Sequence, residues 1–322
     1  MSTVLKRFSL VGVAVALLAT GCGTGPAKAG SAAIVDGQAI QLKTVQDRTT
    51  TVLKKEPVAQ QMQNQGKLDQ ISRWVLADEI AHKIVEHAAQ RENITIDETR
   101  VYDAVKQRGG EDAASQQSVQ DPTTIHRFQR DALVLGELGR RYLATLEVTV
   151  DYFQVKDPKE AREKAEEATA DPAKFAKFVQ EAPRTSSGQQ ASATNQKIRV
   201  SENASLVETM LWGVKPGTVV AFPFGQQQSS WMVALVKERT TLPPVPGEED
   251  LADSVDPKVI AGFGMRIAQF HAADLGIEIN PRYGVWDPTG PSSPDVPAAP
   301  TLVAKPDERA GFVGVTATKN KS

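Results

Sequence analysis

The chain has 322 residues, of which 40% are hydrophobic and 24% are charged, and its formal net charge is −2. This length suffices for one large or two small hydrophobic cores without disulfides or metals, and the near-neutral charge argues against a broad basic surface for nucleic acid. The single cysteine, Cys22, excludes an intramolecular disulfide and a cysteine-based zinc cluster.

The first 22 residues have the pattern of an export signal. Two basic residues precede an apolar run from Phe8 to Leu18, which is too short for a typical membrane-spanning helix. The following Ala19-Thr20-Gly21-Cys22 resembles a bacterial lipobox, although Ala19 stands where leucine is usual. The resemblance implies a lipoprotein signal peptide over 1–22, a lipid anchor on Cys22 and a flexible tether over 23–31. An ordinary secretory signal is the alternative.

The next section is predominantly helical. Residues 34–40 predict a β-hairpin with Asp36-Gly37 as its turn. Apolar residues at helical spacing predict helices over 42–53, 68–89 and 125–142, with Asp69 as the N-cap of the second. The apolar residues of the second helix, including Trp74, cover more than one face, so other helices should pack around it. Asp97 should begin a further short helix, and 109–122 reads as a loop.

The middle section alternates strands and helices. Residues 147–155 predict a strand, and Asp157-Pro158 and Asp171-Pro172 each supply the cap and first residue of a helix. A polar, irregular stretch over 182–196 precedes a strand that starts at Ile198. A short apolar helix with Leu206, Met210 and Leu211, a turn at Lys215-Pro216-Gly217 and two strands follow. The last strand alternates Trp231, Val233 and Leu235, which predicts a half-buried strand after a polar loop over 225–230.

This order, together with the segments DPAKFAKF and LWGVKPGTV, resembles the parvulin domain, the small peptidyl-prolyl isomerase fold. Active parvulins are similar to one another in two strand histidines with a cysteine or acid nearby. Here Tyr152 and Trp231 occupy the histidine positions, and Pro183-Arg184-Thr185 stands where the cysteine or acid is expected. The comparison therefore implies a domain without catalytic residues. Aromatic and apolar side chains suit a peptide-binding groove, for which the candidates are Tyr152, Trp231, Phe175, Met210 and Phe222; core packing is the alternative for Tyr152 and Trp231.

The C-terminal part predicts a linker, a helix, a strand and a tail. Residues 241–257 are rich in proline and acids, and a helix should run from Asp256-Pro257 to Gly276 with the stripe Ile260, Phe263, Ile267 and Phe270. Such a stripe needs a partner, which we expect in the first helical section. Residues 277–286 predict a strand that pairs with the hairpin at 34–40, and the composition of 287–322 predicts a disordered tail.

The motifs VDGQAI near the start and INPRYG near the end resemble SurA-like periplasmic chaperones and PrsA-like foldases. The resemblance implies an α+β chain in which 32–146 and 258–286 together form a helical chaperone module. A parvulin-like domain over 147–240 is inserted into this module and followed by the linker over 241–257.

The preferred functional hypothesis is a chaperone anchored at the outer face of the cell membrane, which binds unfolded or newly secreted polypeptides. No nucleotide-binding or hydrolase motif occurs, and none of the four histidines has the spacing of a metal ligand, so we expect neither cofactor nor metal. Nucleic acid is not an expected partner. Two alternatives are an active parvulin-type peptidyl-prolyl isomerase and a structural envelope lipoprotein with one fixed partner.

Overall fold

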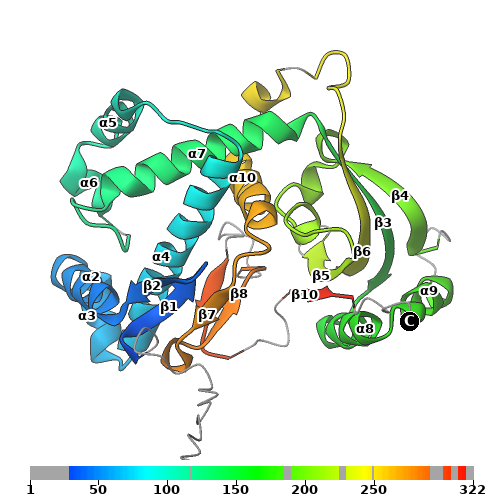
Figure 1. Ribbon diagram of the computed structural model, residues 1–322, viewed down its shortest axis with the longest axis horizontal. Helices are drawn as coiled ribbons and strands as arrows, with labels where there is room; N and C mark the ends of the chain where they lie inside the picture. The colour runs from blue at the N-terminus through cyan, green and yellow to red at the C-terminus, as the bar shows by residue number, and fades with distance from the viewer. Residues whose placement is uncertain are drawn as a thin grey trace, which may run out of the picture.

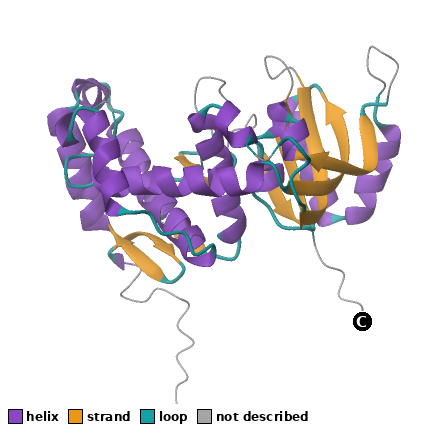
Figure 2. Ribbon diagram, turned by 90° about the horizontal axis from the view of Figure 1, so that it is seen from above, coloured by secondary structure: helices purple, strands orange, loops and turns teal. Residues whose placement is uncertain are grey.

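A computed structural model describes residues 29–116, 118–183, 190–224, 230–248, 250–290, 300–305 and 311–316. The chain is α+β, as predicted, with a helical half and a sheet half side by side (Figures 1 and 2). The export signal with Cys22, the tether up to residue 28 and most of the loop predicted over 225–230 lie outside the described residues.

The helices of the helical half are α2 (Leu42–Lys55), α3 (Pro57–Asn64), α4 (Leu68–Arg91), α5 (Glu98–Gln107), α6 (Glu111–Ser115), α7 (Ile125–Leu143) and α10 (Pro257–His271). Its strands are β1 (Ser31–Val35), β2 (Gln38–Gln41), β7 (Ile277–Ile279), β8 (Val285–Asp287) and β9 (Thr301–Val303). The sheet half contains β3 (Leu146–Val155), α8 (Pro158–Ala170), α9 (Pro172–Glu181), β4 (Ser192–Arg199), β5 (Thr218–Phe224), β6 (Ser230–Thr241) and β10 (Phe312–Val315). Short 3₁₀ turns are η1 (Val200–Glu202), η2 (Ala204–Leu206), η3 (Met210–Trp212), η5 (Leu251–Ser254) and η6 (Pro281–Tyr283).

Most helix starts follow from local sequence. The side chains of Asp97, Asp157, Asp171 and Asp256 each accept a backbone N–H in the first turn of the helix that follows, which satisfies donors that would otherwise lack partners. Asp69 was wrongly predicted as a cap, because α4 begins after Lys67 and Asp69 lies within its first turn. There the Asp69 carboxylate forms an ion pair of 2.6 Å with Arg73, one turn further along the helix. The α10 helix ends at His271, before the predicted Gly276, and the chain turns there into β7.

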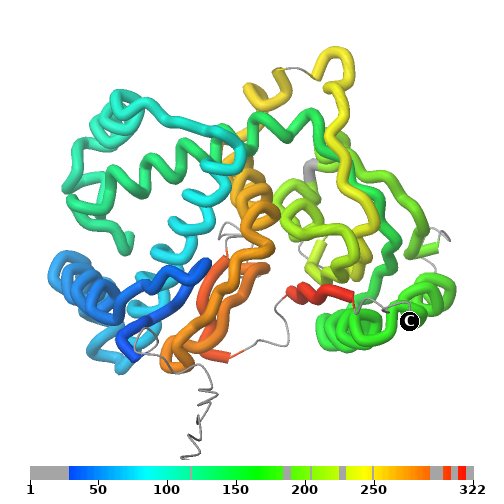
Figure 3. The backbone as a smooth tube through the Cα atoms, in the orientation of Figure 1, coloured from blue at the N-terminus to red at the C-terminus, as the bar shows by residue number. Residues whose placement is uncertain are grey.

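The N-terminal hairpin forms as predicted, and Asp36 and Gly37 both have positive φ, of 49° and 72°, as a tight hairpin turn requires. The predicted pairing with the C-terminal strand is also confirmed: β7 pairs antiparallel with β1, with Val35 opposite Ile277. Figure 3 shows this meeting of the blue start of the chain with the orange segment that contains β7. Asn280 extends the contact through its side-chain amide, which donates to the Ser31 carbonyl oxygen at 3.0 Å.

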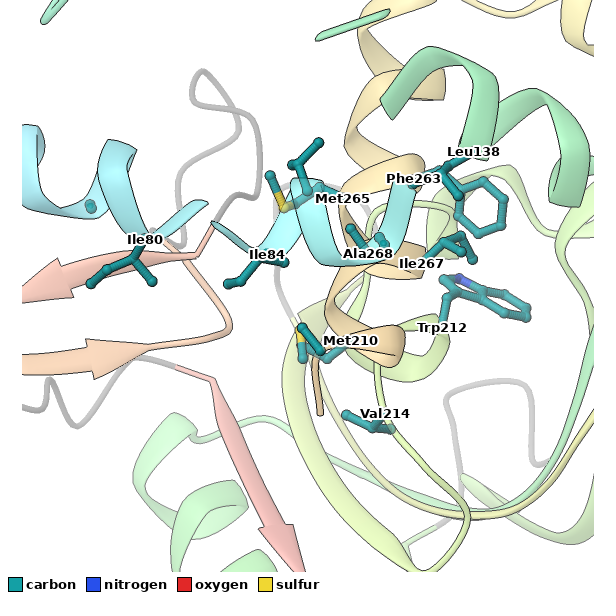
Figure 4. Close-up of a cluster of buried hydrophobic side chains, with 14 of the residues drawn as sticks. Ile80, Ile84, Leu138, Met210, Trp212, Val214, Phe263, Met265, Ile267 and Ala268 are labelled. Atoms are coloured by element: carbon teal, nitrogen blue, oxygen red, sulfur yellow. The ribbon is translucent and has the colours of Figure 1, made fainter. Parts of the chain in front are cut away.

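The expected packing of α10 on the first helical section is confirmed, because α10 lies against α7 and α4. Ile260, Phe263 and Ile267 are buried at this contact. In Figure 4, Phe263 and Ile267 of α10 face Leu138 of α7 and Trp212 of η3, so the returning helix also joins the sheet half to the helical half. Trp74 differs from expectation, since 41% of it is exposed.

The large sheet has the strand order β10-β5-β6-β3-β4. The helices α8 and α9 cover one face, where Phe153, Phe175 and Val233 belong to one buried cluster. The other face carries Val150, Ala234 and Val236, which belong to the larger core shared with the helical half. The last strand, β6, is therefore buried on both faces along its first part and is not half-buried as predicted.

Two sequence predictions need further correction. The strand expected from Ile198 begins at Ser192 as β4. The expected apolar helix through Leu206 and Met210 is a series of 3₁₀ turns, stabilised by the Trp212 indole N–H, which donates to the Leu206 carbonyl oxygen at 2.6 Å. In the linker, η5 is held to α7 by an ion pair of 2.7 Å between Arg140 and Asp253.

The prediction of a disordered tail over 287–322 is wrong for two described segments. Thr301–Val303 forms β9 and pairs with β8, and Phe312–Val315 forms β10 and pairs with β5. The apolar runs TLV and FVGV are strand-forming, but they are only three and four residues long and stand among prolines and alanines, so average composition conceals them.

Candidate binding groove

A groove of about 520 Å³ lies between the helical half and the sheet half. One wall comes from the end of η3 and the turn into β5, and the other from the end of α10 and from β7 and β8. Side chains of β10 complete the lining. The apolar members of the lining are Ile84, Met210, Val214, Pro216, Ala272, Ala273, Leu275, Ile277, Trp286, Pro288, Val313 and Val315.

Local backbone geometry places the first wall. Gly217 has a φ of 87°, which a glycine adopts at low cost, and its N–H donates to the Val236 carbonyl oxygen at 2.8 Å. This turn aims Val214 and Pro216 at the groove before β5 enters the sheet. Gly213 lies close to α10, since a Cβ there would meet the Arg266 carbonyl oxygen at 3.1 Å. The wall is thus fixed both to the sheet and to the C-terminal helix.

Few charges line the groove. Lys215 from the first wall forms an ion pair with Asp274 from the second, so the pair bridges the two walls. The hydrogen bond from Lys215 lowers the pKa of the Asp274 carboxyl below its usual value. Gln269 is the other long polar side chain of the lining, and it donates to the Pro288 carbonyl oxygen at 2.7 Å. A mainly apolar surface with neutralised charges suits an apolar ligand.

The buried Arg266 holds three segments around the groove together. Its guanidinium donates to the carbonyl oxygens of Glu208, Pro288 and Thr289 at 2.8, 3.0 and 2.9 Å, and also contacts Met210 Sδ and Gln269 Oε1 at 2.8 Å each. Burial lowers the pKa of Arg266 to about 10, and nearby Glu208 opposes that shift. The arginine therefore remains charged at neutral pH and satisfies acceptors from both halves.

A second buried cluster joins the halves near the end of α10. Arg239 of β6 donates to the Trp212 carbonyl oxygen at 2.7 Å, and its guanidinium lies 4.0 Å from the ring centre of Phe270. Burial lowers the pKa of Arg239 to about 10. Beside it, Glu92 accepts a hydrogen bond of 2.7 Å from the Tyr142 hydroxyl and lies 2.8 Å from His271 Nε2. Burial and this hydrogen bond raise the pKa of Tyr142 to about 12.

A smaller pocket of about 260 Å³ lies between α4, α7 and α10. His82 Nδ1 lies 2.8 Å from Asp131 Oδ2 at this pocket, and burial raises the pKa of Asp131 above its usual value. Phe128, Leu135 and Met265 make most of the remaining lining apolar. The pocket belongs to the helical half and does not include a residue of the large sheet.

The structure does not bring the five predicted groove residues together. Trp231 and Phe175 belong to the cluster beneath α8 and α9, whereas Tyr152, Met210 and Phe222 belong to the larger core on the opposite face of the sheet. Trp231, Phe175, Met210 and Phe222 are buried, and Tyr152 is half-buried. Met210 alone lines the groove between the halves. A role of any other of these side chains in peptide binding stays a prediction.

Sequence reasoning missed most residues of this groove because its walls come from segments far apart in the chain. Trp286 lies two residues after the INPRYG motif, and an aromatic residue in the middle of a short strand was the one available signal. Val313 and Val315 lie in the segment taken for a disordered tail. All four histidines lie on α4, α7 and α10, away from the positions of Tyr152 and Trp231 in the sheet.

Within the part of the chain that the structure describes, no cluster of three or more histidine, cysteine, aspartate or glutamate residues could hold a metal ion. Over the same residues, no helix has both the length and the apolar character needed to cross a membrane.

No family model matches the sequence, and no curated protein matches it either. Among solved structures, the peptidylprolyl isomerase PrsA from Bacillus anthracis is 12% identical over 61% of this chain and 94% of its own, with a TM-score of 0.22. A structure described as a SurA-like chaperone from Campylobacter jejuni is 13% identical over 78% of this chain and 99% of its own, with a TM-score of 0.23. At these scores neither similarity carries a conclusion about this chain.

Proposed function

We propose that this protein is a chaperone, anchored at the outer face of the cell membrane, that binds unfolded or newly secreted polypeptides in the groove between its two halves. The observation that carries the proposal is the groove, which has a volume of about 520 Å³ and is lined mainly by apolar side chains. The charges of Lys215 and Asp274 in its lining are paired with each other across the two walls. An unfolded chain presents apolar side chains that a folded protein buries. Such a groove holds them by burial alone, which needs no nucleotide or metal.

The proposal includes the division of the chain. Residues 32–146 and 258–286 form one module and 147–240 an inserted parvulin-like domain, joined by the linker over 241–257. The pairing of β7 with β1 and the packing of α10 on α7 support this division. The groove then lies where the module and the insert meet, so both contribute to client binding.

We propose further that the insert does not catalyse isomerisation. Tyr152 and Trp231 face opposite sides of the sheet and pack into different cores, so they do not form one polar centre around a proline peptide bond. Uncatalysed isomerisation takes tens to hundreds of seconds at 25 °C. We expect a proline-containing test peptide to isomerise at this rate with the protein present. A rate about a hundredfold higher that is lost in Trp231→Phe or Tyr152→Phe would favour the isomerase alternative.

Ala273→Asp tests the groove. Ala273 is exposed and lines the second wall, so the variant should fold without strain. Its new carboxylate should weaken the binding of apolar client segments, because burying an unpaired charge is costly. We expect the wild type to suppress the aggregation of chemically unfolded citrate synthase, measured by light scattering. The variant should need about fivefold more protein for the same effect, equivalent to about 1 kcal/mol.

Ala173→Asp is the matched control, because Ala173 is exposed in the first turn of α9, away from the groove. An acid there is favourable for the helix, and suppression should match the wild type. Two results would favour a structural lipoprotein instead. One is an equal loss of aggregation suppression in both variants, and the other is a wild type that suppresses no aggregation but captures one stoichiometric partner.

The anchor has a separate test. Cys22→Ser in the full chain removes the thiol to which a diacylglycerol would be joined. We expect the wild type in the membrane fraction and the variant in the soluble extracytoplasmic fraction, while purified samples of both suppress aggregation equally. A wild type that is soluble and carries no lipid by mass spectrometry would leave an ordinary secretory signal as the explanation.

A further inference from the structure

The strand β10 closes the edge of the large sheet, although it lies far along the chain from its neighbour β5. The chain leaves the sheet after β6, forms α10 and β7 to β9 in the helical half, and returns as β10. The register runs from Phe312 opposite Ala221 to Val315 opposite Thr218. Beyond the strand, the Thr316 N–H donates to the Gly217 carbonyl oxygen at 3.0 Å.

Without β10, β5 would be an edge strand with unpaired backbone groups. Residues 218–222 of β5 are buried, and an exposed strand edge with such residues is a template for pairing with another chain. Only four residues of β10 cover this edge, and its side chains are half-buried or exposed, with Val315 74% exposed. The backbone ladder therefore supplies much of the contact, which is the contact that any extended chain can reproduce.

Two side chains of β10 add selectivity. Phe312 packs against the cluster beneath α8, with the Arg162 guanidinium 5.8 Å from its ring centre. Val313, on the other face of the strand, lines the groove between the halves. A Cβ on Gly314 would lie 2.7 Å from both Phe312 Cζ and Thr169 Oγ1, so the position after the aliphatic residue accepts only glycine without movement. The edge thus favours the order aromatic, aliphatic, glycine.

Among the described residues, a third cavity, of about 230 Å³, lies between β10 and the β8–β9 hairpin, lined by Trp286, Asp287, Val303 and Phe312 among others. Trp286, Pro288 and Val313 line both this cavity and the main groove. An extended segment that replaced β10 would therefore lie along the groove and not inside a packed core.

We propose that the edge of β5 is a strand-addition site for an extended segment of an unfolded polypeptide, and that β10 is the chain's own occupant of this site. The preferred client segment has an aromatic residue, an aliphatic residue and a glycine in succession, flanked by strand-forming residues. This proposal rests on the proposed function, since it assigns part of the client to a defined strand. The resident β10 competes with the client, so displacement of β10 raises affinity.

A pair of proline substitutions tests the competition in the full chain. Because the Thr316 N–H points at β5, the alternation of an antiparallel ladder directs the Gly314 N–H toward β5 and the Val315 N–H away from it. Gly314→Pro removes an inward donor and should displace β10, whereas Val315→Pro is the matched control at an outward position. The probe is a fluorescein-labelled peptide with the sequence AGFVGVTA, measured by fluorescence anisotropy.

We expect Gly314→Pro to bind the probe about tenfold or more tightly than the wild type, and Val315→Pro to bind it as the wild type does. A probe with aspartate in place of the phenylalanine should not bind. Equal affinities for the wild type and Gly314→Pro, an equal gain in Val315→Pro, or binding that ignores the phenylalanine would each overturn the proposal.

A locked variant gives the opposite change and does not depend on a destabilising proline. Thr218 and Val315 face each other at a pair without mutual backbone hydrogen bonds, where Cα atoms lie closest. In Thr218→Cys/Val315→Cys with Cys22→Ser, oxidation should abolish probe binding and reduction should restore it. Binding unaffected by oxidation would overturn the strand site, while suppression of aggregation that still depends on Ala273 would leave the proposed function standing.

Discussion

Gly264 of α10 crosses Leu135 of α7 so closely that a Cβ on the glycine would lie 1.9 Å from the leucine carbonyl oxygen. A second close approach lies along the same pair of helices, where a Cβ on Gly139 would lie 2.1 Å from the Ile260 carbonyl oxygen. Since both obstacles are backbone atoms, a side chain at either glycine moves the helices apart. The C-terminal helix is thus joined to the first section by shape as well as by apolar burial.

Two alanine substitutions on α7 test this contact. Gly139→Ala should lower the free energy of unfolding by about 1–3 kcal/mol, because the methyl group meets α10. Gly136→Ala, on the same helix with no atom within 4 Å of the added Cβ, should raise it by about 0.5–1 kcal/mol through helix propensity. Urea unfolding followed by circular dichroism measures both. Equal effects would contradict the close crossing.

Removal of Arg266 should loosen the frame of the groove. Arg266→Met keeps most of the side-chain volume but leaves the carbonyl oxygens of Glu208, Pro288 and Thr289 without their donor. We expect a loss of about 3–5 kcal/mol in the free energy of unfolding and faster amide hydrogen exchange at residues 286, 287 and 289. Arg282→Met, at an exposed arginine of η6, should change neither. Unchanged exchange in Arg266→Met would show that other contacts hold these segments.

Stability should fall in mildly acidic solution through His271. Burial lowers the pKa of His271 below 6.5, nearby Glu92 raises it, and Arg239 and Arg91 lower it. The unfolded chain therefore takes up this proton more readily than the folded one, so stability is full above pH 6.5 and declines as the pH falls through 6.5 toward the folded pKa. The pKa of Glu92 is also lowered, but from 4.5, so its contribution is lost only at lower pH.

His271→Gln removes this titration. We expect the variant to show a smaller decrease in the free energy of unfolding between pH 7.5 and pH 5.5 than the wild type, with urea titrations at each pH as the measurement. His87→Gln, at a half-buried histidine of α4, serves as the control. If the free energy of unfolding decreases between pH 7.5 and pH 5.5 as much in His271→Gln as in the wild type, another group is responsible for this pH dependence.

Trp231 and Trp74 offer a contrast between packing and surface roles. Trp231 is 5% exposed within the cluster beneath α8 and α9, whereas Trp74 is 41% exposed on α4. Trp231→Ala should lower the free energy of unfolding by about 3–5 kcal/mol, and Trp74→Ala by less than about 1 kcal/mol. If Trp231 grips peptide instead, its loss should reduce client binding and leave the urea midpoint unchanged.

Local chemistry made the fold partly predictable. The aspartate-proline pairs at 157–158 and 171–172 identify helix starts because they satisfy the first N–H groups and preset φ, whatever the rest of the chain does. The Leu206 to Leu211 stretch misled because its apolar spacing is helical, whereas its backbone follows contacts outside a helix. The Trp212 indole N–H donates to the Leu206 carbonyl oxygen, and the distant Arg266 donates to the Glu208 carbonyl oxygen.

The groove was not predictable in the same way. Its walls combine Val214, Leu275, Trp286 and Val313, which no sequence period connects. The prediction instead placed Tyr152 and Trp231 by their register within one domain, and register alone does not separate the two faces of a sheet that is buried on both. Tyr152 and Trp231 consequently lie in different cores.

If the chain is exported as proposed, the pairing of β1 with β7 sets an order of events during translocation. A polypeptide that crosses the membrane from its amino end presents Ala33 to Val35 long before Ile277 to Ile279 emerge. Until then, the first section lacks both β7 and α10, so the apolar side chains of α4 and α7 that pack against α10 stay in water. On the proposed export route, the protein would therefore itself be a nascent secreted chain with exposed apolar surface for most of its translocation, and it would become competent only when nearly all of it had arrived.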